Sequence, residues 1–447
     1  MARRQRLLLS LLAAPAPPCR LLALALPPAA DEQPTLIDVD VTNVTNARVS
    51  PNIMGCHADL GFSSLPTFFS ANMVYEPAFG PGTMKVPPWF ARSTLDGSAS
   101  PVARSFVCPT VTDSVAVKND TTAVNRGVGG VGMSFEAGRE YEFEAYCRFQ
   151  LSHLRDGDDL SSHSQQERTV YAELRDSKSG TVLARHDVNL SGFDPQVYTQ
   201  RLSFTLVPSA STSCTPVQNG TNPLIDCGPA HEGFEGYCLD CGGELSIGVT
   251  GEAEVYLGWV GLSPGPWGRV MAKDGTALPA LRRAAEVVEA MGVRLIRFGG
   301  SFAKSIRWKD WIGPFWNRPS SRHRHHWSAL GGWGFVESVD FANALNIVPV
   351  FTLGSNPNTA QDLADLVEYC WGDNTTVWGS TRVRDGHPAV LNVTSFEVGN
   401  EETTVDFVDK ISAMVGLILA AQSLLEELER SALAHRSCDR GSCGRRR

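Results

Sequence analysis

The sequence predicts a multidomain protein that combines an α/β region with an all-β region. The α/β region is expected to be a partial (β/α)8 barrel with about four of its eight strands, into which a β-sandwich is inserted. Three observations favour this fold. Segments of strand period dominate residues 91–262, helix-then-strand units repeat over residues 263–435, and polar or aromatic residues follow the apolar strands. Barrel active sites lie at that carboxyl end of the strands.

The all-β region shows the alternation of apolar and polar residues that half-buried strands have. Clear examples are residues 141–146, 169–174 and 252–260, with turn signals at 176–180 and 191–192 between them. Short alternating strands without helical stretches predict an antiparallel β-sandwich over residues 91–262.

The α/β region changes to a helical period. Residues 278–291 are expected to form an amphipathic helix that Gly292 ends, and two more helices are expected over residues 336–345 and 359–371. Each is followed by an apolar strand, directly or at some distance. Repeated helix-then-strand units with apolar strands predict a parallel sheet covered by helices.

Four segments can serve as barrel strands one to four: residues 53–56, 294–298, 347–352 and 395–398. Residues 35–90 would hold the first strand and the loop after it, and residues 263–435 the rest of the half-barrel. Since a closed barrel takes eight strands in about 250 residues, we expect a C-terminally truncated or mis-spliced reading frame. A genuine short form is the alternative. Residues 436–447 form an irregular basic tail.

The N-terminus has the layout of a secretory signal peptide. Three arginines in the first six residues precede a mostly apolar stretch over residues 7–28 and two small residues at 29–30. We therefore expect residues 1–30 to be a signal peptide and the protein to be secreted, although the prolines in the stretch leave a plain leader as an alternative. Six Asn-x-Ser/Thr sequons fit glycosylation on that route. They are Asn43, Asn119, Asn189, Asn219, Asn374 and Asn392.

Four of the eleven cysteines cluster within residues 214–241. In an oxidising compartment this cluster predicts a disulfide-stapled loop whose pairing the spacing leaves open. A zinc site is the alternative. The clustered residues are Cys214, Cys227, Cys238 and Cys241.

The charge and hydropathy of the chain argue against several classes of partner. A net charge of −9 gives no electrostatic footprint for nucleic acid or an anionic membrane. No segment reaches the ~20 apolar residues of a spanning helix, and the longest candidate, residues 411–425, is expected to be a buried barrel helix. The composition implies no cofactor.

The strongest chemical motif is Phe-Glu-Val-Gly-Asn-Glu at residues 396–401. Gly399 allows a sharp exit from the strand, which leaves two polar side chains at its end. Glycosidic cleavage needs a carboxylic acid beside the leaving oxygen, and a neighbouring amide can bind a sugar hydroxyl. Glu401 and Asn400 are the candidates for these two parts. The alternative is a helix N-terminus with acidic residues in its first turn.

A second motif combines a strand end with aromatic residues. Arg297 precedes paired glycines at residues 299–300, and paired glycines allow close approach of backbone to ligand. Five tryptophans follow nearby, and their faces suit the apolar faces of sugars, unless they simply pack the loop. They are Trp308, Trp311, Trp316, Trp327 and Trp333. The histidines at 323, 325 and 326 are expected to be solvated, so no metal site is predicted.

Taken in order, the motifs resemble the α-L-arabinofuranosidases of glycoside hydrolase family 51. They are Val-Ser-Pro-Asn-Ile-Met-Gly-Cys-His at 49–57, Gly-Pro-Trp-Gly-Arg at 265–269, Arg-Phe-Gly-Gly-Ser at 297–301, Trp-Ile-Gly-Pro at 311–314, Asn-Arg-Pro at 317–319, Leu-Val-Glu-Tyr-Cys at 366–370 and the motif at 396–401. The family's eukaryotic members carry a carbohydrate-binding-module-like sandwich after the first strand, which matches residues 91–262.

The resemblance implies a retaining hydrolase that releases terminal α-L-arabinofuranosyl residues from arabinose-containing polysaccharides. Glu401 would be the general acid/base and Asn400 a sugar-binding neighbour, while the nucleophilic glutamate belongs at the end of a seventh strand that this chain does not include. The chain departs from the family pattern at two places. The family often has an acidic residue soon after the first strand, where this chain has His57 and Asp59, and Asp59 is the nearer chemical match. The family commonly has Asn after the paired glycines, where this chain has Ser301. The expected substrate contacts are Asn400, Asp59, Arg297, Gly300, Ser301, Trp311, Asn317 and Trp333.

Two other functions stay open. One is a non-catalytic carbohydrate-binding protein that uses the sandwich and the strand ends without bond cleavage. The other is a different barrel glycosidase, such as a β-xylosidase or an endo-glucuronidase. In each case the expected partner is a polysaccharide or oligosaccharide.

Overall fold

The computed structural model describes the chain in segments between residues 55 and 419. The signal peptide and the basic tail predicted above lie outside these residues, as do Ser301, Asn43, Asn219, Cys227 and Cys238. The described segments are 55–59, 69–74, 89–93, 99–101, 104–105, 114–119, 121–127, 132–151, 168–193, 200–216, 239–251, 253–300, 307–318, 322–323, 326–327, 333–354, 358–401, 412–413, 415–416 and 419.

A four-stranded parallel sheet lies at the centre of the α/β region. Its strand order is β1-β17-β20-β21, so the four strands lie side by side in chain order. Every neighbouring pair is parallel. The strands are β1 (Gly55–Asp59), β17 (Leu295–Gly299), β20 (Val348–Leu353) and β21 (Ser395–Val398). The expected strands agree with these to within two or three residues.

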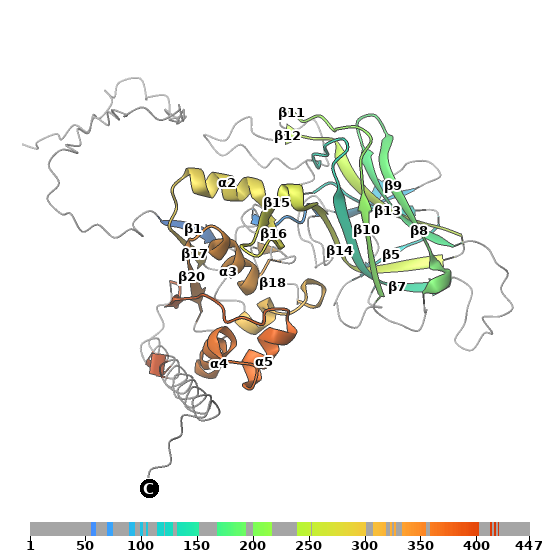
Figure 1. Ribbon diagram of the computed structural model, residues 1–447. Coiled ribbons are helices and arrows are strands. Elements are labelled where there is room, and N and C mark those ends of the chain that lie inside the picture. Colours follow the sequence, from blue (N-terminus) through green and yellow to red (C-terminus); the bar gives the residue numbers. More distant parts are fainter. Residues whose placement is uncertain are drawn as a thin grey trace, which may run out of the picture.

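Helices pack against this sheet through a shared apolar core (Figure 1). Phe298 of β17 stacks on Phe351 of β20 with ring centroids 5.3 Å apart, and Phe335 lies 4.3 Å from Phe351. Burying each of these rings contributes about 1.5–3 kcal/mol. These helices are α2 (Arg282–Ala290), α3 (Phe335–Ala344) and α4 (Ala360–Trp371), while α5 (Val377–Arg384) packs against α4.

The start of α4 follows from its sequence. The Thr359 hydroxyl accepts a hydrogen bond from the Asp362 N–H at 3.1 Å, and the Asp362 carboxylate accepts one from the Thr359 N–H at 2.9 Å. This reciprocal capping box satisfies two N–H groups that the first turn of a helix leaves without partners. Helix α4 is therefore fixed where the sequence places it.

The first expected helix, residues 278–291, is wrong over its first four residues. Residues 277–281 form strand β16 (Ala277–Leu281), which pairs with β15 (Arg269–Met271), and the helix begins at Arg282. The Pro279 carbonyl accepts a hydrogen bond from the Ala71 N–H at 3.0 Å. Strand pairing thus takes the backbone groups that a longer helix would use.

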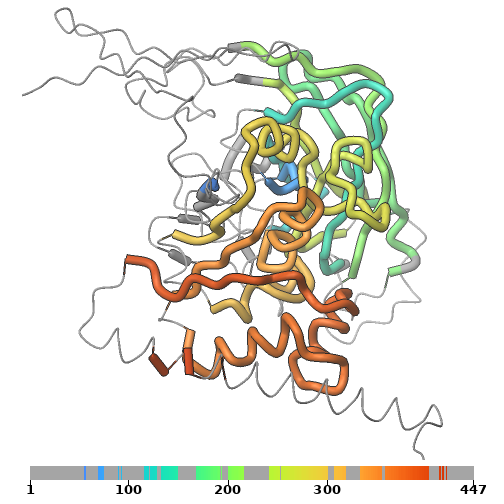
Figure 2. The backbone as a smooth tube through the Cα atoms, turned by 60° about the vertical axis from the view of Figure 1, so that its left-hand side comes forward, coloured from blue at the N-terminus to red at the C-terminus, as the bar shows by residue number. Residues whose placement is uncertain are grey.

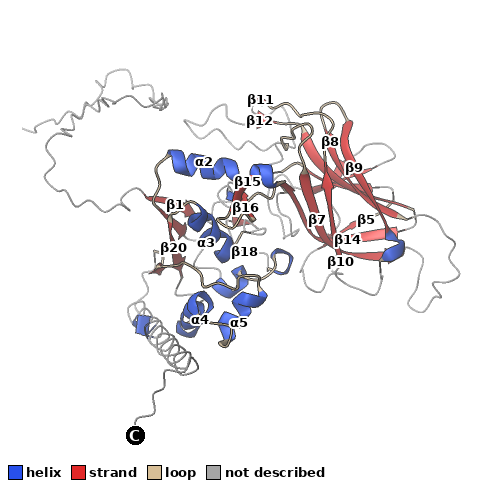
Figure 3. Ribbon diagram, in the orientation of Figure 1, coloured by secondary structure: helices blue, strands red, loops and turns tan. Residues whose placement is uncertain are grey.

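The all-β region consists of two larger antiparallel sheets, which Figure 3 draws to the right of helices α2 to α5. One has the order β10-β7-β14-β5-β4 and the other β3-β2-β6-β13-β8-β9. Their inward-facing residues share one apolar cluster. The strands of the first sheet are β4 (Arg104–Ser105), β5 (Ser114–Val117), β7 (Tyr141–Leu151), β10 (Gln200–Leu206) and β14 (Ala253–Pro264). Those of the second are β2 (Trp89–Ser93), β3 (Ala99–Pro101), β6 (Thr121–Asn125), β8 (Thr169–Asp176), β9 (Thr181–Asn189) and β13 (Gly243–Thr250).

The tube in Figure 2 shows how the two regions join: the chain leaves the antiparallel strands and passes into the elements around α2. Strand β2 begins at Trp89, so it crosses the predicted boundary at residue 90, and β14 ends at Pro264. The prediction of an α/β region joined to an all-β region is confirmed at this coarse level. The closer assignments of a partial barrel and a carbohydrate-binding sandwich stay predictions.

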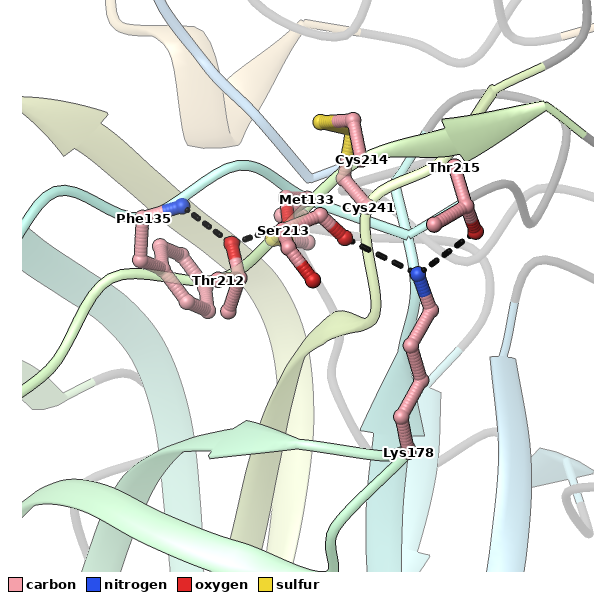
Figure 4. Close-up of a disulfide and its surroundings, with 8 residues drawn as sticks. All are labelled: Met133, Phe135, Lys178, Thr212, Ser213, Cys214, Thr215 and Cys241. Carbon is pink, nitrogen blue, oxygen red and sulfur yellow. Dashed lines mark hydrogen bonds between the residues drawn. A yellow bond between two sulfur atoms is a disulfide. The ribbon is translucent and has the colours of Figure 1, made fainter.

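One disulfide lies in the cysteine cluster, between Cys214 and Cys241 (Figure 4). It stands beside the short pair of strands β11 (Thr215–Pro216) and β12 (Leu239–Asp240). The Lys178 ammonium donates to the Ser213 carbonyl at 2.9 Å and to the Thr215 hydroxyl at 3.0 Å. For these two cysteines the disulfide interpretation is confirmed.

No helix within the described residues is long and apolar enough to span a membrane. The expected helix over residues 411–425 lies largely outside the described residues. Where it is described, Val415 and Leu419 are exposed, so the expected burial is wrong at these two positions.

Candidate active site

The carboxyl ends of the four parallel strands form one edge of the sheet. In the register, Asp59 stands opposite Gly299, and Leu353 stands opposite Val398. Gly300, Asn400 and Glu401 come directly after these strand ends, so the sheet brings three of the predicted site positions to a common edge. Asp59 is the last residue of β1 and lies on the same edge. This is the end at which parallel α/β folds bind ligands.

The exit from β21 turns sharply. Gly399 has φ 89°, which an L-residue rarely adopts, and its N–H donates to the Leu353 carbonyl at 2.7 Å. Glu401 has φ 50°, one of two non-glycine residues with positive φ among those described. Such a conformation costs on the order of 1 kcal/mol and is concentrated at functional sites. The turn leaves Glu401 exposed at the strand end.

A charged network lies just below this turn. The Arg297 guanidinium donates to both carboxylate oxygens of Glu397, through Nη2 to Oε1 at 2.9 Å and through Nε to Oε2. The Thr352 hydroxyl donates to Oε2 of the same carboxylate at 2.8 Å. These side chains come from β17, β20 and β21, so three neighbouring strands contribute to one network.

The network fixes the side chain of Asn400. Arg297 Nη2 donates to Asn400 Oδ1 at 2.9 Å. Because a guanidinium only donates, the amide must turn its oxygen to Arg297 and its NH2 group away. Asn400 is 8% exposed, and its Nδ2 has no hydrogen-bond partner within the part of the chain that the structure describes. An oriented, buried donor without a partner among the described residues, beside Glu401, is suited to donate to a ligand oxygen.

The paired glycines serve two different needs. A Cβ at Gly299 would lie 2.0 Å from the Thr352 hydroxyl oxygen, so Gly299 is required for the packing of β17 against β20. Gly300 has φ 95°, so it is required for the backbone turn after the strand. The sequence predicted close approach to a ligand. At Gly299 the close approach is to a neighbouring strand.

The predicted aromatic contacts are mostly packing residues as the structure places them. Trp333 is 2% exposed, and its indole donates to the Ser338 hydroxyl at 2.7 Å. Trp308 and Trp311 are buried in the same apolar cluster. For Trp333 and Trp311, burial favours the packing alternative over sugar stacking. Asn317, at the end of the short helix η8 (Phe315–Asn317), is exposed, and its part in substrate binding stays a prediction.

Glu397 and Thr352 were not predicted as site residues from the sequence. Glu397 belongs to the motif at residues 396–401. The alternation of residues along a strand does not show which residues of the neighbouring strands its side chain contacts. The register supplies that information, because Thr352 stands opposite Glu397. Arg297 was predicted as a substrate contact, whereas the structure brings its guanidinium to Glu397 and Asn400.

The remaining predicted sites are surface positions. Four sequons fall on described residues, and each of these asparagines is exposed; they are Asn119, Asn189, Asn374 and Asn392. His323 and His326 stand opposite each other in the short pair β18 (Arg322–His323) and β19 (His326–Trp327). No group of three or more potential metal-binding side chains was found among the residues that the structure describes.

Comparison with known proteins identifies the class of this region. Residues 287–423, which run from within α2 past Glu401, match the family description "Alpha-L-arabinofuranosidase 1 domain". The chain is 33% identical over 119 residues to an extracellular exo-α-L-arabinofuranosidase from Streptomyces chartreusis, a match that covers 23% of this chain and 14% of that protein. It is 28% identical over 141 residues to a probable α-L-arabinofuranosidase A from Aspergillus niger, covering 26% and 22%.

A solved structure supports the fold. The structure of an arabinose-bound family 51 α-L-arabinofuranosidase aligns with 80% of this chain and 54% of its own, with a TM-score of 0.55 and 18% sequence identity. At that identity the likeness concerns the fold alone. The chain therefore spans about half of that structure and a smaller part of the two relatives.

The parallel-sheet region thus resembles glycoside hydrolases. More particularly, residues 287–423 match the α-L-arabinofuranosidase 1 domain, and the resemblance to the family 51 α-L-arabinofuranosidases is confirmed.

Proposed function

We propose that the chain acts as a retaining glycoside hydrolase that releases terminal α-L-arabinofuranosyl residues from arabinose-containing polysaccharides, with Glu401 as general acid/base. The observation that carries the proposal is the juxtaposition at the end of β21. An exposed carboxyl group on a sharp turn directly follows a buried amide whose donor has no partner among the described residues.

Each side chain has a distinct task in this proposal. Glu401 donates its proton to the glycosidic oxygen as the bond to the anomeric carbon breaks, and later removes a proton from the attacking water. The Asn400 NH2 group donates to a sugar hydroxyl oxygen, an interaction that strengthens in the transition state. The nucleophilic carboxylate that retention requires is assigned to no residue of this chain.

Glu397 is a positioning residue rather than an alternative acid. Its carboxylate accepts two hydrogen bonds from Arg297 and one from Thr352. These hydrogen bonds engage both carboxylate oxygens, so the group is held in the network. Its task is to hold Arg297, which in turn orients Asn400.

The finer features of fold and setting belong to the same proposal. The four-stranded parallel sheet is the first half of a (β/α)8 barrel, and the two antiparallel sheets are a carbohydrate-binding-like β-sandwich. Asp59, Gly300, Ser301 and Asn317 line the substrate site. The leader and the word "extracellular" in the name of the Streptomyces relative support secretion.

The test compares Glu401→Gln with Glu402→Gln, a matched change one residue away. With nitrophenyl α-L-arabinofuranoside and with arabinoxylan as substrates, Glu401→Gln is expected to lower the rate about 10²–10⁴-fold, since general acid/base catalysis contributes that much. The loss should be greater on arabinoxylan, because a nitrophenolate leaves with less need of a proton. Glu402→Gln should retain the rate.

Three results separate the alternatives. Undiminished hydrolysis by Glu401→Gln would refute the assignment of the acid/base. Faster hydrolysis of nitrophenyl xyloside or glucuronide would favour a different barrel glycosidase. If the whole chain binds arabinoxylan but hydrolyses none of these substrates, the non-catalytic carbohydrate-binding function is favoured.

A further inference from the structure

A cavity of about 140 Å³ lies where the two regions meet, well separated in the sequence from the end of β21. Its walls include Trp259 and Glu144 from the five-stranded sheet. Asn72 and Phe315, which lie outside that sheet, close it from the other region. Asn72 belongs to a connecting segment in which Phe69 is part of the core of the parallel region and Val74 part of the core of the antiparallel region. The cavity therefore exists only when both regions are in place.

Two donors in residues that line this cavity lack partners. Asn72 Oδ1 accepts hydrogen bonds from the Val74 and Leu262 N–H groups, both at 3.1 Å, which fixes the amide and leaves its Nδ2 buried. Trp259 is 5% exposed, and its indole Nε1 is buried as well. Neither nitrogen has a hydrogen-bond partner among the described residues. Buried donors are normally satisfied, so two such donors in lining residues favour a ligand that supplies acceptor oxygens.

The charges around the cavity cancel. Arg201 donates to the Glu144 carboxylate at 2.6 Å, and Arg269 pairs with Glu142. All four line the cavity, and they are its charged lining residues. With two positive and two negative side chains already paired, a charged ligand would have to break an ion pair to gain one. The lining therefore favours a neutral ligand with several oxygen atoms.

An aromatic surface completes the lining. A Cβ at Gly261 would lie 2.4 Å from the Trp259 ring, so the glycine is what lets the indole lie against the sheet. Phe315 stands nearly parallel to it, with ring centroids 6.4 Å apart and planes at 17°. Aromatic faces beside polar groups suit a ring that has an apolar face and hydroxyl edges.

We propose that this junction is a second carbohydrate site, which binds one neutral monosaccharide unit and is separate from the strand-end site. The cavity is smaller than the about 300–1,000 Å³ typical of sites for larger ligands, which limits it to a single sugar ring. The sugar hydroxyl oxygens accept from Asn72 Nδ2 and Trp259 Nε1, and its apolar face rests on the aromatic lining. The site needs residues from both regions, so an isolated antiparallel domain would lack it.

The experiment follows the Trp259 indole N–H signal by NMR in the full chain, with L-arabinose, D-xylose and the charged sugar D-glucuronate as separate probes. The chain has ten tryptophans, and Trp259→Phe, which keeps the ring surface, assigns the signal by its loss. We expect a saturable shift with at least one of the two pentoses. Binding of that pentose, measured by isothermal titration calorimetry because Trp259→Phe lacks the indole signal, should weaken about fivefold or more in Trp259→Phe and in Asn72→Asp, since each loses one donor.

Asn400→Ala is the matched control, because it removes the unpartnered donor of the strand-end site. It should leave the Trp259 shift unchanged while affecting hydrolysis, so the two proposals can fail separately. Three results would overturn the second site in a chain with wild-type circular dichroism: no sugar moves the Trp259 signal, D-glucuronate binds more tightly than the pentoses, or Trp259→Phe binds as the wild type does. A crystal soaked in the bound pentose that shows only water on both nitrogens would overturn it too.

Discussion

Two arginine–carboxylate pairs of the parallel region have similar geometry and different surroundings. Arg297 and Glu397 meet at the strand ends, with side chains 25% and 37% exposed. Arg318, which follows η8, and Glu337 of α3 meet with both side chains 8% exposed and two nitrogen–oxygen distances of 2.9 Å. The first pair opens toward a polar edge and the second is enclosed.

The enclosed pair ties a loop to a helix. Glu337 also accepts from the Gly334 N–H at 2.8 Å, which caps the start of α3, and Arg318 also donates to the Gly313 carbonyl at 2.7 Å. In the open pair, Arg297 also donates to Asn400 Oδ1, and Asn400 Nδ2 has no hydrogen-bond partner among the described residues. The enclosed pair, whose other hydrogen bonds go to backbone groups, stabilises the fold. The open pair orients a donor that has no partner among the described residues, and so prepares a ligand site.

The largest expected effect is on the enclosed pair. Glu337→Gln removes the carboxylate that pairs with the buried Arg318 side chain and should lower the free energy of unfolding by about 3–5 kcal/mol, as breaking a buried pair does. Denaturant unfolding measures this directly. Glu289→Gln, an exposed change of the same type on α2, is the control and should have little effect. A loss below about 1 kcal/mol for Glu337→Gln would mean that the pair is no stronger than a surface one.

For the open pair, the loss should appear mainly in catalytic activity, with little change in the free energy of unfolding. Glu397→Gln weakens the hold on Arg297 and frees the Asn400 amide to rotate. We expect kcat/KM for nitrophenyl α-L-arabinofuranoside to fall about 10–100-fold, since misplacing one site group costs that much. The free energy of unfolding should change by about 1 kcal/mol or less, because the pair is partly exposed.

Thr352→Val separates positioning from general damage to the site. It removes one neutral hydrogen bond to Glu397 and leaves the Arg297 contacts, so its effect on kcat/KM should be several times smaller. The side-chain amide signal of Asn400 in NMR gives a readout that does not depend on hydrolysis, and it should shift in Glu397→Gln. Equal losses in both variants, with an unmoved amide signal, would contradict the positioning role.

The sequence predicted the strands better than the contacts between them. Residues 395–398 were placed correctly as the fourth strand, since an apolar segment before a Gly-Asn-Glu turn has few other structures open to it. The helix over residues 278–291 failed at its start because pairing with β15 decides the backbone there, and that contact is not local. Strand alternation predicts burial, whereas pairing partners depend on register.

The same distinction applies to the candidate site. The positions of Asn400 and Glu401 followed from the local motif, and the structure brings both to the strand ends. The network around Glu397 could not be predicted, because Arg297 lies a hundred residues away and meets it only through the order of β17, β20 and β21. For Trp333 and Trp311 the residue type suited sugars, whereas the structure buries both in the core around α3, so their part in substrate binding stays a prediction.

A partly buried carboxylate that pairs with a histidine instead of an arginine gives the smallest effect, and this effect can be tested by pH. Asp340 lies on α3, one turn from Glu337, and its nearest basic group is His387 Nδ1 at 3.9 Å. Burial raises the pKa of Asp340 to about 6, although His387 acts in the opposite direction. Because the folded state holds this proton more tightly than the unfolded chain, with its ordinary pKa of 3.8, Asp340 favours folding below pH 4. That contribution is lost as the pH rises through about 6.

Asp340→Asn removes the ionisable group and should therefore stabilise the protein at pH 7 by about 1–2 kcal/mol relative to wild type, after allowance for partial exposure. The difference should shrink between pH 6 and pH 4, where the wild-type carboxyl becomes protonated in both states. Thermal unfolding of the two proteins across this range measures it. If Asp340→Asn is instead less stable than wild type at pH 7, and this difference narrows on acidification, the Asp340 carboxylate is a stabilising partner of His387. Asp340 would then resemble the two arginine–carboxylate pairs and would no longer contrast with them.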